Sequence, residues 1–238
     1  MDVGRGTLPT VSIVVPVYNG ARTVAACIES LLEQAYPSDH YEVIVVENGS
    51  TDATSDVVAR YPVRLLHSPV RGPAAARNLG YIQSQADIVA FTDADCIAHP
   101  RWLLEMTRLY VEDPEVGGVG GAILAYAHGE RTEVERFLDE HPPLINWVSS
   151  ADQYLPHLLT ANASYRRTLL AQAGGFDPIF VAAADVDLSW RLQVELGAKL
   201  AYAPKAVVYH HHRATREGLG RMYRRTGFVE VLLDTMFW

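Results

Sequence analysis

The chain has 238 residues, of which 49% are hydrophobic and 20% are charged, and its formal net charge at pH 7 is −8. This is an ordinary globular composition with enough chain to bury a core, and the acidic balance argues against a protein that binds nucleic acid through bulk electrostatics. No stretch approaches the run of about 18 apolar residues that a membrane-spanning helix needs.

The first hundred residues alternate between apolar runs and segments with a helical period. Strands are predicted over residues 11–17, 41–46, 63–66 and 87–91. Helices are predicted over residues 21–34, 53–60 and 74–85. Alternation at this spacing is typical of βαβ units, which build a parallel sheet with right-handed crossovers. Residues 10–100 are therefore predicted to be a nucleotide-binding half, because ligands of such sheets bind at the carboxyl ends of the strands.

Residues 101–213 are predicted to form an acceptor and catalytic half, followed by a helical tail over residues 214–238. Helices are predicted over residues 100–113, 167–173 and 185–196. Strands are predicted over residues 116–127, 160–166, 199–202 and 206–209. Residues 128–160 show a mixed pattern. Because no linker and no repeat interrupts the chain, we predict a single α/β domain with a mostly parallel, Rossmann-like sheet flanked by helices.

Two carboxylates directly follow the fourth predicted strand. Asp93 and Asp95 flank Ala94, and residues i and i+2 of an extended chain point the same way, roughly 6–7 Å apart. Acids in this arrangement repel each other unless a positive group lies between them, and a divalent cation is the usual partner. The alternative is a pair of solvated turn aspartates that cap the next helix.

Polar clusters also follow the first two strands, at residues 16–20 and 47–52. The carboxyl ends of parallel strands share one edge of a sheet, so these clusters should converge with Asp93 and Asp95. No G-x-G-x-x-G follows the first strand and the chain contains no G-x-x-x-x-G-K-[ST]. Neither a dinucleotide-binding fold nor a P-loop is therefore supported.

Six sequence motifs occur in a fixed order between residues 10 and 213. They are S-I-V-V-P-V-Y-N-G from residue 12, V-I-V-V-E-N-G-S-T-D from 43, G-P-A-A-A-R-N-L-G from 72, D-A-D-C from 93, G-G-F-D from 174 and A-D-V-D-L-S-W-R-L from 184. This set resembles the inverting glycosyltransferases of family 2, which have the GT-A fold. The resemblance implies an enzyme that transfers a sugar from a nucleoside-diphosphate sugar to an acceptor hydroxyl.

The resemblance also implies which residues form the nucleotide pocket. Pro16, Val17 and Tyr18 would line the base pocket, and Glu47 and Asn48 would address the base and the ribose. The family more often has aspartates at both of the last two positions. The Asn48 amide has both a donor and an acceptor, so it can still pair with a uracil edge; the alternative is an asparagine that only forms the turn.

Further along the chain, the resemblance implies the groups that neutralise the diphosphate. Arg77 matches a family position near the nucleotide, where a guanidinium suits phosphate oxygens; the alternative is a surface charge on a helix. Asp93 and Asp95, with Ala94 between them, would hold Mg²⁺ or Mn²⁺. His210 is favoured as a third metal ligand because a late histidine is common in GT-A enzymes, and a plain polar strand end is the alternative.

Inverting transfer requires a carboxylate opposite the leaving group that takes the proton of the acceptor hydroxyl. Asp185 matches the aspartate of the family's Glu-Asp motif and would be this general base, while Ala184 replaces the glutamate. Asp187 lies about 200° round the helix from Asp185 and four residues before Arg191, so we expect a structural ion pair. Trp190 either stacks on a sugar or belongs to the core.

Three functions are compared on these residues. The leading hypothesis is metal-dependent inverting transfer from a UDP-sugar or similar donor to a glycan, a lipid-linked acceptor or a small molecule. A nucleotidyltransferase that makes sugar nucleotides would need a basic, Gly-rich loop after the first strand, and residues 17–22 contain one arginine. A catalytically silent nucleotide-sugar-binding module is favoured by Ala184, but Asp93, Asp95 and Asp185 argue against it.

The tail and the cysteines bear on location. Residues 214–238 are basic and aromatic, which predicts peripheral contact with the inner face of a membrane; packing on the core and continuation into further residues are the alternatives. The two cysteines lack metal-type spacing and no secretory pattern opens the sequence, so we expect a reducing, cytoplasmic compartment. No nucleic-acid partner is expected.

Overall fold

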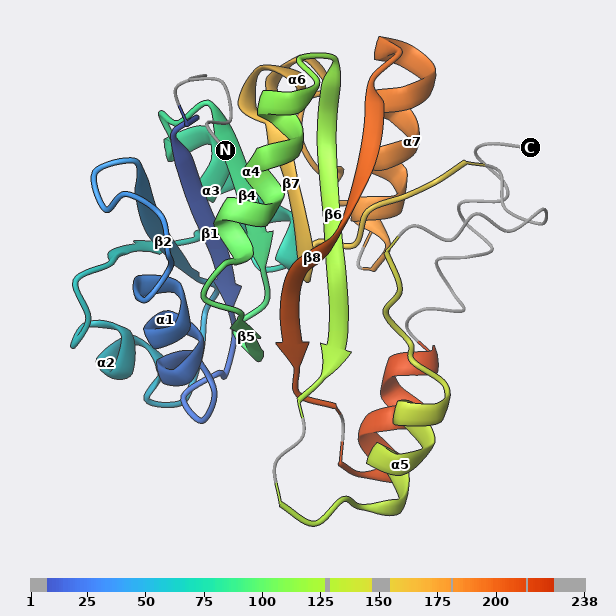
Figure 1. The fold of residues 1–238 in the computed structure, drawn as a ribbon. Coiled ribbons are helices and arrows are strands. Elements are labelled where there is room, and N and C mark those ends of the chain that lie inside the picture. Colours follow the sequence, from blue (N-terminus) through green and yellow to red (C-terminus); the bar gives the residue numbers. More distant parts are fainter. Residues whose placement is uncertain (1–7, 127–128, 147–154, 181, 213, 225–238) are drawn as a thin grey trace.

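A computed structural model describes residues 8–126, 129–146, 155–180, 182–212 and 214–224. Within these residues, eight strands form one sheet with the order β3-β2-β1-β4-β7-β6-β8-β5 (Figure 1). The strands are β1 (Val11–Val17), β2 (Tyr41–Glu47), β3 (Arg64–His67), β4 (Ile88–Thr92), β5 (Cys96–Ala98), β6 (Val116–Ala125), β7 (Asn162–Arg166) and β8 (Lys199–His210). The helices are α1 (Val24–Leu32), α2 (Thr54–Val58), α3 (Pro73–Gln83), α4 (Trp102–Glu112), α5 (Glu133–Glu140), α6 (Arg167–Gln172) and α7 (Ala184–Leu196).

The sheet combines a parallel half with a mixed half. β1 pairs in parallel with β2 and β4, and β2 pairs in parallel with β3. β7 runs antiparallel to β4 and β6, β8 runs parallel to β6, and β5 runs antiparallel to β8. The predicted single α/β domain with a mostly parallel, Rossmann-like sheet is confirmed, because both halves of the sequence contribute strands to the same sheet.

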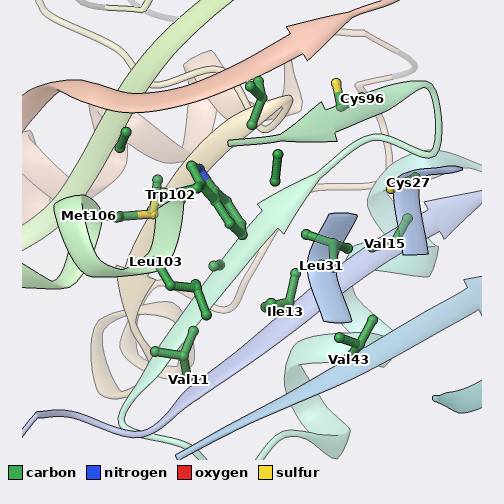
Figure 2. Packing of buried hydrophobic residues seen from close by; sticks show 14 of the residues in the cluster. Val11, Ile13, Val15, Cys27, Leu31, Val43, Cys96, Trp102, Leu103 and Met106 are labelled. Carbon is green, nitrogen blue, oxygen red and sulfur yellow. The ribbon is translucent and has the colours of Figure 1, made fainter. Parts of the chain in front are cut away.

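Side chains of the central strand β1 alternate between the two faces of the sheet. Ile13 and Val15 belong to a buried cluster with residues of α1 and α4, whereas Val14 belongs to a second cluster with residues of α3, α6 and α7. Figure 2 shows Trp102 and Leu103 of α4 in the first cluster. The period of two in a strand therefore buries β1 on both faces, which explains why its sequence is a continuous apolar run.

Two differences from the predicted elements concern the end of the sheet around β8. Residues 199–210 form one strand rather than two, and residues 204–206 bulge because Gly121 pairs with Ala203 while Ala122 pairs with Val207. Pro204 lies in this bulge, as expected of a residue that cannot donate to a ladder. The strand β5 was not predicted, because three residues are too few to show an alternation.

The C-terminal tail is only partly described. Residues 216–224 form a helix, and Arg216 Nη2 lies 2.9 Å from Glu133 Oε2 of α5, so this helix lies beside α5 (Figure 1). The predicted membrane contact depends mainly on residues 225–238, which lie outside the described residues. In the part of the chain that the structure describes, no helix is long and apolar enough to cross a bilayer.

Gly121 lies beside the bulge of β8, at the register shift between β6 and β8, and a Cβ there would overlap the Ala206 carbonyl oxygen and the Asn162 amide. We therefore expect Gly121→Ala to lower the free energy of unfolding by about 1–3 kcal/mol, as overpacking does. Gly220→Ala is the matched control, because its Cβ would meet only Arg224 Nη1 at 3.6 Å in a helix. Urea unfolding of both variants is the measurement, and equal midpoints would contradict the prediction.

Candidate functional site

The strands β1, β2 and β4 end at one edge of the sheet. Val17 and Glu47, the last residues of β1 and β2, are paired in register, and Asp93 follows the end of β4. β8 ends at His210, and the carboxyl ends of β1, β6 and β8 point to the lower edge in Figure 1. The convergence predicted from the three polar clusters is therefore what the topology produces.

The D-A-D-C segment is a tight connection between two strands. The Cys96 N–H donates to the Asp93 carbonyl at 3.0 Å, and Cys96 begins β5. The predicted extended geometry of the two aspartates is therefore wrong, because the chain turns here. The alternative prediction, that they cap a helix, is also wrong, since a strand follows them. The turn is anchored by the Asp95 carbonyl, which accepts from His211 N–H at 3.0 Å.

The two carboxylates of this turn have different basic neighbours. Asp93 Oδ1 accepts from Arg77 Nη2 at 3.0 Å. Arg77 is 9% exposed, so the alternative of a surface helix charge is excluded. Its guanidinium lies 5.9 Å from the ring centroid of Phe176, and its Nε has no hydrogen-bond partner among the described residues. Arg77 therefore leaves Asp93 one carboxylate oxygen for other partners.

Asp95 lies beside the histidine that was predicted as a third metal ligand. His210 Nε2 lies 3.6 Å from Asp95 Oδ1, and β5 pairs with β8 at this point, with Cys96 opposite His210. The His210 side chain is 10% exposed, and its Nδ1 has no hydrogen-bond partner in the described parts of the chain. The structure thus brings the predicted Asp95 and His210 together through a strand pairing that the sequence did not reveal.

These residues fit a divalent cation that is shared with phosphate. Within the described ranges, no three histidine, cysteine, aspartate or glutamate side chains are grouped closely enough to hold a metal by themselves. Mg²⁺ usually binds through one or two carboxylates plus substrate phosphates rather than an all-protein cage. Asp95 and the second oxygen of Asp93 are oxygen donors of the required kind, and His210 Nε2 adds a nitrogen donor beside them.

The predicted base-pocket residues lie around the end of β1. Tyr18 is 53% exposed, and the Arg71 guanidinium lies 5.8 Å from the centroid of its ring. Val17 is buried and belongs to the core, so its side chain faces away from solvent, while Pro16 is half-buried. Arg71 was missed by the sequence analysis, because nothing in the sequence relates it to Tyr18.

Glu47 and Asn48 hold the loops at this edge. Asn48 Nδ2 donates to the Val70 carbonyl at 2.8 Å, and its Oδ1 accepts from Gly72 N–H at 2.7 Å. Burial raises the pKa of the Glu47 carboxyl, but hydrogen bonds led by those from Ser50 outweigh it, so the pKa lies below its usual value. Both polar ends of Asn48 are therefore engaged by the loop before α3, which is a contact between distant segments rather than the local turn considered as the alternative.

The predicted general base lies in the first turn of α7. Asp185 Oδ2 accepts from Thr160 N–H at 2.9 Å and from Thr160 Oγ1 at 3.0 Å, and Oδ1 accepts from Val186 N–H at 3.1 Å. A carboxylate can accept about four hydrogen bonds, so one acceptor position stays available. Burial lowers the pKa of nearby His157, although the charge of Asp185 acts in the opposite direction. A lone histidine in a mixed segment gave no sequence signal.

The remaining residues of the last motif are structural. Asp187 is 2% exposed, and its Oδ2 accepts from Arg191 Nη2 at 2.6 Å and from Nε at 2.9 Å. The expected ion pair is confirmed. Trp190 is 8% exposed and donates to the Leu155 carbonyl at 3.0 Å, so the core alternative holds. Ala184, at the position where the family has glutamate, is also buried in the core.

The turn around G-G-F-D connects α3 with α7. Asn78, next to Arg77 on α3, donates to the Phe176 carbonyl at 2.7 Å and accepts from Phe176 N–H at 2.8 Å. Arg191 of α7 donates to the Gly175 carbonyl at 2.9 Å. Gly175 has φ +75°, and a Cβ there would lie 2.5 Å from Asn78 Oδ1. The turn therefore links the helix that carries Arg77 to the helix that carries Asp185.

Comparison with known proteins identifies the class. The family described as Glycosyl transferase family 2 matches residues 12–174, which is more than half of the chain. The chain belongs to this family and is a glycosyltransferase domain, as the sequence motifs predicted. It is 31% identical over 225 residues to the glycosyltransferase AglE of Haloferax volcanii, covering 92% of this chain and 72% of that protein.

Other relatives and solved structures are similar over most of this chain. A pre-mycofactocin glycosyltransferase of Mycobacterium tuberculosis is 35% identical over 212 residues, and the match covers 85% of this chain but 43% of that protein. A mannosyltransferase of Pyrobaculum calidifontis, PcManGT, in complex with GDP-Man and Mn²⁺ superposes with a TM-score of 0.70 at 25% identity, covering 91% of this chain and 61% of that chain. TarS of S. aureus in complex with UDP superposes at 0.65 and 21% identity, covering 85% and 60%. The predicted GT-A fold is thereby confirmed.

The buried ion pair of α7 generates a stability prediction. Because Asp187 is buried, Arg191→Met leaves an unpaired carboxylate in the core, and we expect a loss of about 3–5 kcal/mol in the free energy of unfolding. Arg216→Met is the control, since Arg216 and Glu133 are both largely exposed and such pairs contribute about 0–1 kcal/mol. Urea unfolding measures both variants. Equal losses in both would show that the Asp187–Arg191 pair does not stabilise this turn.

Proposed function

We propose that this domain transfers a sugar, with inversion, from a nucleoside-diphosphate sugar to an acceptor hydroxyl, and that Mn²⁺ or Mg²⁺ is required. The proposal depends mainly on one observation. Each carboxylate of the D-A-D turn has its own basic neighbour, which is Arg77 for Asp93 and His210 for Asp95. The complex of PcManGT with GDP-Man and Mn²⁺, the most similar of the structures described above, supports a donor and a cation of this kind.

In this proposal Asp95, His210 and the second oxygen of Asp93 would hold the cation. A bound cation would neutralise the negative charge that develops on the leaving diphosphate. Arg77 fixes the orientation of Asp93 through its Nη2, and its remaining buried N–H groups suit phosphate oxygens. His210 is kept in place by the pairing of β8 with β5.

Asp185 would accept the proton of the acceptor hydroxyl as the sugar is transferred. Its Oδ2 is oriented by Thr160 and its Oδ1 keeps one free acceptor position, as described above. The hydrogen-bonded turn around Phe176 links the helix that carries Arg77 to the helix that carries Asp185. This link supports a proposed base that is held in a fixed position relative to the donor site.

The identity of the base is the part of the proposal that depends on Tyr18 and the loop before α3. Tyr18 is the exposed aromatic ring at this edge, and a base that stacks there would lie beside Arg71. A UDP-sugar was favoured because Asn48 can pair with uracil, but the loop already uses both polar ends of that amide. Because the amide that favoured uracil is occupied, UDP and GDP are tested side by side as donor nucleotides.

A thermal-shift panel of UDP, GDP, dTDP and CDP with Mn²⁺, Mg²⁺ or EDTA tests the donor site. A ligand at 100 times its Kd stabilises the native state by about 2.7 kcal/mol, so we expect a large metal-dependent shift for one nucleotide. Asp95→Ala should abolish that shift, while Asp56→Ala, which changes an exposed residue of α2, should retain it. A flat panel, or a shift that survives both EDTA and Asp95→Ala, would overturn the proposed site.

The base role of Asp185 is tested by nucleotide release from the donor identified in the panel. Asp185→Asn keeps the shape of the side chain but removes its basicity, so we expect turnover to fall about 10²–10⁴-fold while the nucleotide thermal shift is retained. Asp56→Asn is the matched control and should leave turnover unchanged. Binding of nucleotide without any turnover in the unmodified protein would instead support the silent binding module.

A further inference from the structure

A hollow of about 170 Å³ lies at the same edge of the sheet as Asp95. It is enclosed by the end of β6, by α5, by the residues that follow α5, and by the end of β8. His210 lines this hollow and also faces Asp95 at 3.6 Å. The hollow therefore adjoins the proposed donor site, with His210 between them, and neither the motifs nor the comparisons assign a role to it.

The walls of the hollow are mostly apolar. Leu138 of α5 is 1% exposed, whereas Leu124 of β6 is 48% exposed, so an apolar surface runs from the core out to solvent. Pro143 and Leu144 complete the wall on the side of α5. An engineered cavity of roughly 150 Å³ with aliphatic and aromatic walls is known to bind benzene. By that comparison, the hollow accommodates one apolar group of the size of a benzene ring.

Two histidines supply the polar side of the hollow. The His210 and His212 side chains are 10% and 7% exposed, and the Nδ1 atoms of both have no hydrogen-bond partner in the described ranges. Asp139 also lines the hollow, but Arg131 Nη2 at 3.4 Å compensates its charge, and His212 Nε2 lies 3.6 Å from the same carboxylate. The hollow therefore combines apolar walls with two mostly buried imidazoles, one of which lies next to Asp95.

We propose that this hollow is an acceptor subsite, which takes an apolar group of about six carbons that the acceptor carries. The proposal rests on the proposed function, because the hollow adjoins the D-A-D turn. The donor is a poor occupant, since the hydroxyls of a sugar or ribose would lose their hydrogen bonds to water against apolar walls. Acceptors with an aryl or short alkyl substituent are thus preferred over unsubstituted sugars.

The test compares two probes that differ only in the aglycone, phenyl β-D-glucoside and methyl β-D-glucoside. Saturation-transfer NMR measures their binding to the full chain in the presence of Mn²⁺ and the nucleotide that the thermal-shift panel selects. A hydrophobic pocket discriminates about 10–200-fold for a single methylene. We therefore expect the phenyl glucoside to reach half-saturation at a concentration at least about tenfold lower than the methyl glucoside.

Variants locate the preference in the hollow. Ala125→Phe places a ring inside the hollow, and Leu124→Asp places a charge at its exposed wall. Each variant should reduce the preference for the phenyl glucoside to less than about twofold, because an apolar group is no longer stabilised in a pocket that is filled or charged. Leu124→Asp changes an exposed side chain and covers the case in which Ala125→Phe does not fold. Val194→Phe, at a 55% exposed position of α7, is the control and should keep the preference.

The outcomes separate this inference from the proposed function. Equal binding of the two glucosides, or a preference that survives Leu124→Asp, overturns the subsite, whatever the donor site does. If Leu124→Asp removes the aryl preference but the unmodified protein never releases nucleotide from any donor, the hollow stands as an apolar ligand site and sugar transfer is overturned. A preference together with nucleotide release supports both proposals.

Discussion

The ion pair between Arg77 and Asp93 is the interaction on which the arrangement of the site depends. It joins α3 to the turn after β4, and α3 can approach β1 this closely because Gly80 has no side chain to overlap Val14. The next residue on α3, Asn78, binds both backbone groups of Phe176. The donor-side carboxylates are therefore held by a helix whose position is set by the close packing of Gly80 on β1 and by the hydrogen bonds of Asn78 to a distant turn.

The same turn carries the link onward to α7. Arg191 binds the Gly175 carbonyl while it pairs with the buried Asp187. Asp185 lies two residues earlier in the same helix, with its carboxylate oriented by Thr160. A short series of hydrogen bonds thus connects the D-A-D turn to the proposed base. Because each link is buried or half-buried, the separation between the two carboxylate groups is a property of the packed domain rather than of any one loop.

The proposed acceptor subsite is built differently from the proposed donor site. Donor-side residues follow parallel strands that are buried on both faces, whereas the hollow beside His210 is formed by the ends of β6 and β8 together with α5. The donor side must bind charges, and it presents carboxylates and a guanidinium. The hollow presents leucine and proline walls with two imidazoles. In the proposed arrangement, this contrast would let one edge of the sheet bind a nucleoside diphosphate and an apolar acceptor group next to each other.

Much of this arrangement could be predicted from the sequence, because it depends on local patterns. The apolar runs and the helical periods predicted the class of fold, and the order of the motifs predicted the family. The spacing of Asp187 and Arg191 predicted their ion pair, since residues four apart on a helix are neighbours wherever the helix lies. In each case the relevant partners are close in sequence, or the pattern repeats along the chain.

Contacts between distant segments were decided only by the tertiary structure. The turn conformation of D-A-D-C depends on β5, and three residues become a strand there only because β8 pairs with them. The same pairing brings His210 to Asp95, and the packing of α3 brings Arg77 to Asp93. The hollow exists because α5 lies against the end of β6. The sequence by itself determined which side chains and elements were present, whereas long-range packing decided which of those side chains meet, because such contacts leave no periodic signal along the chain.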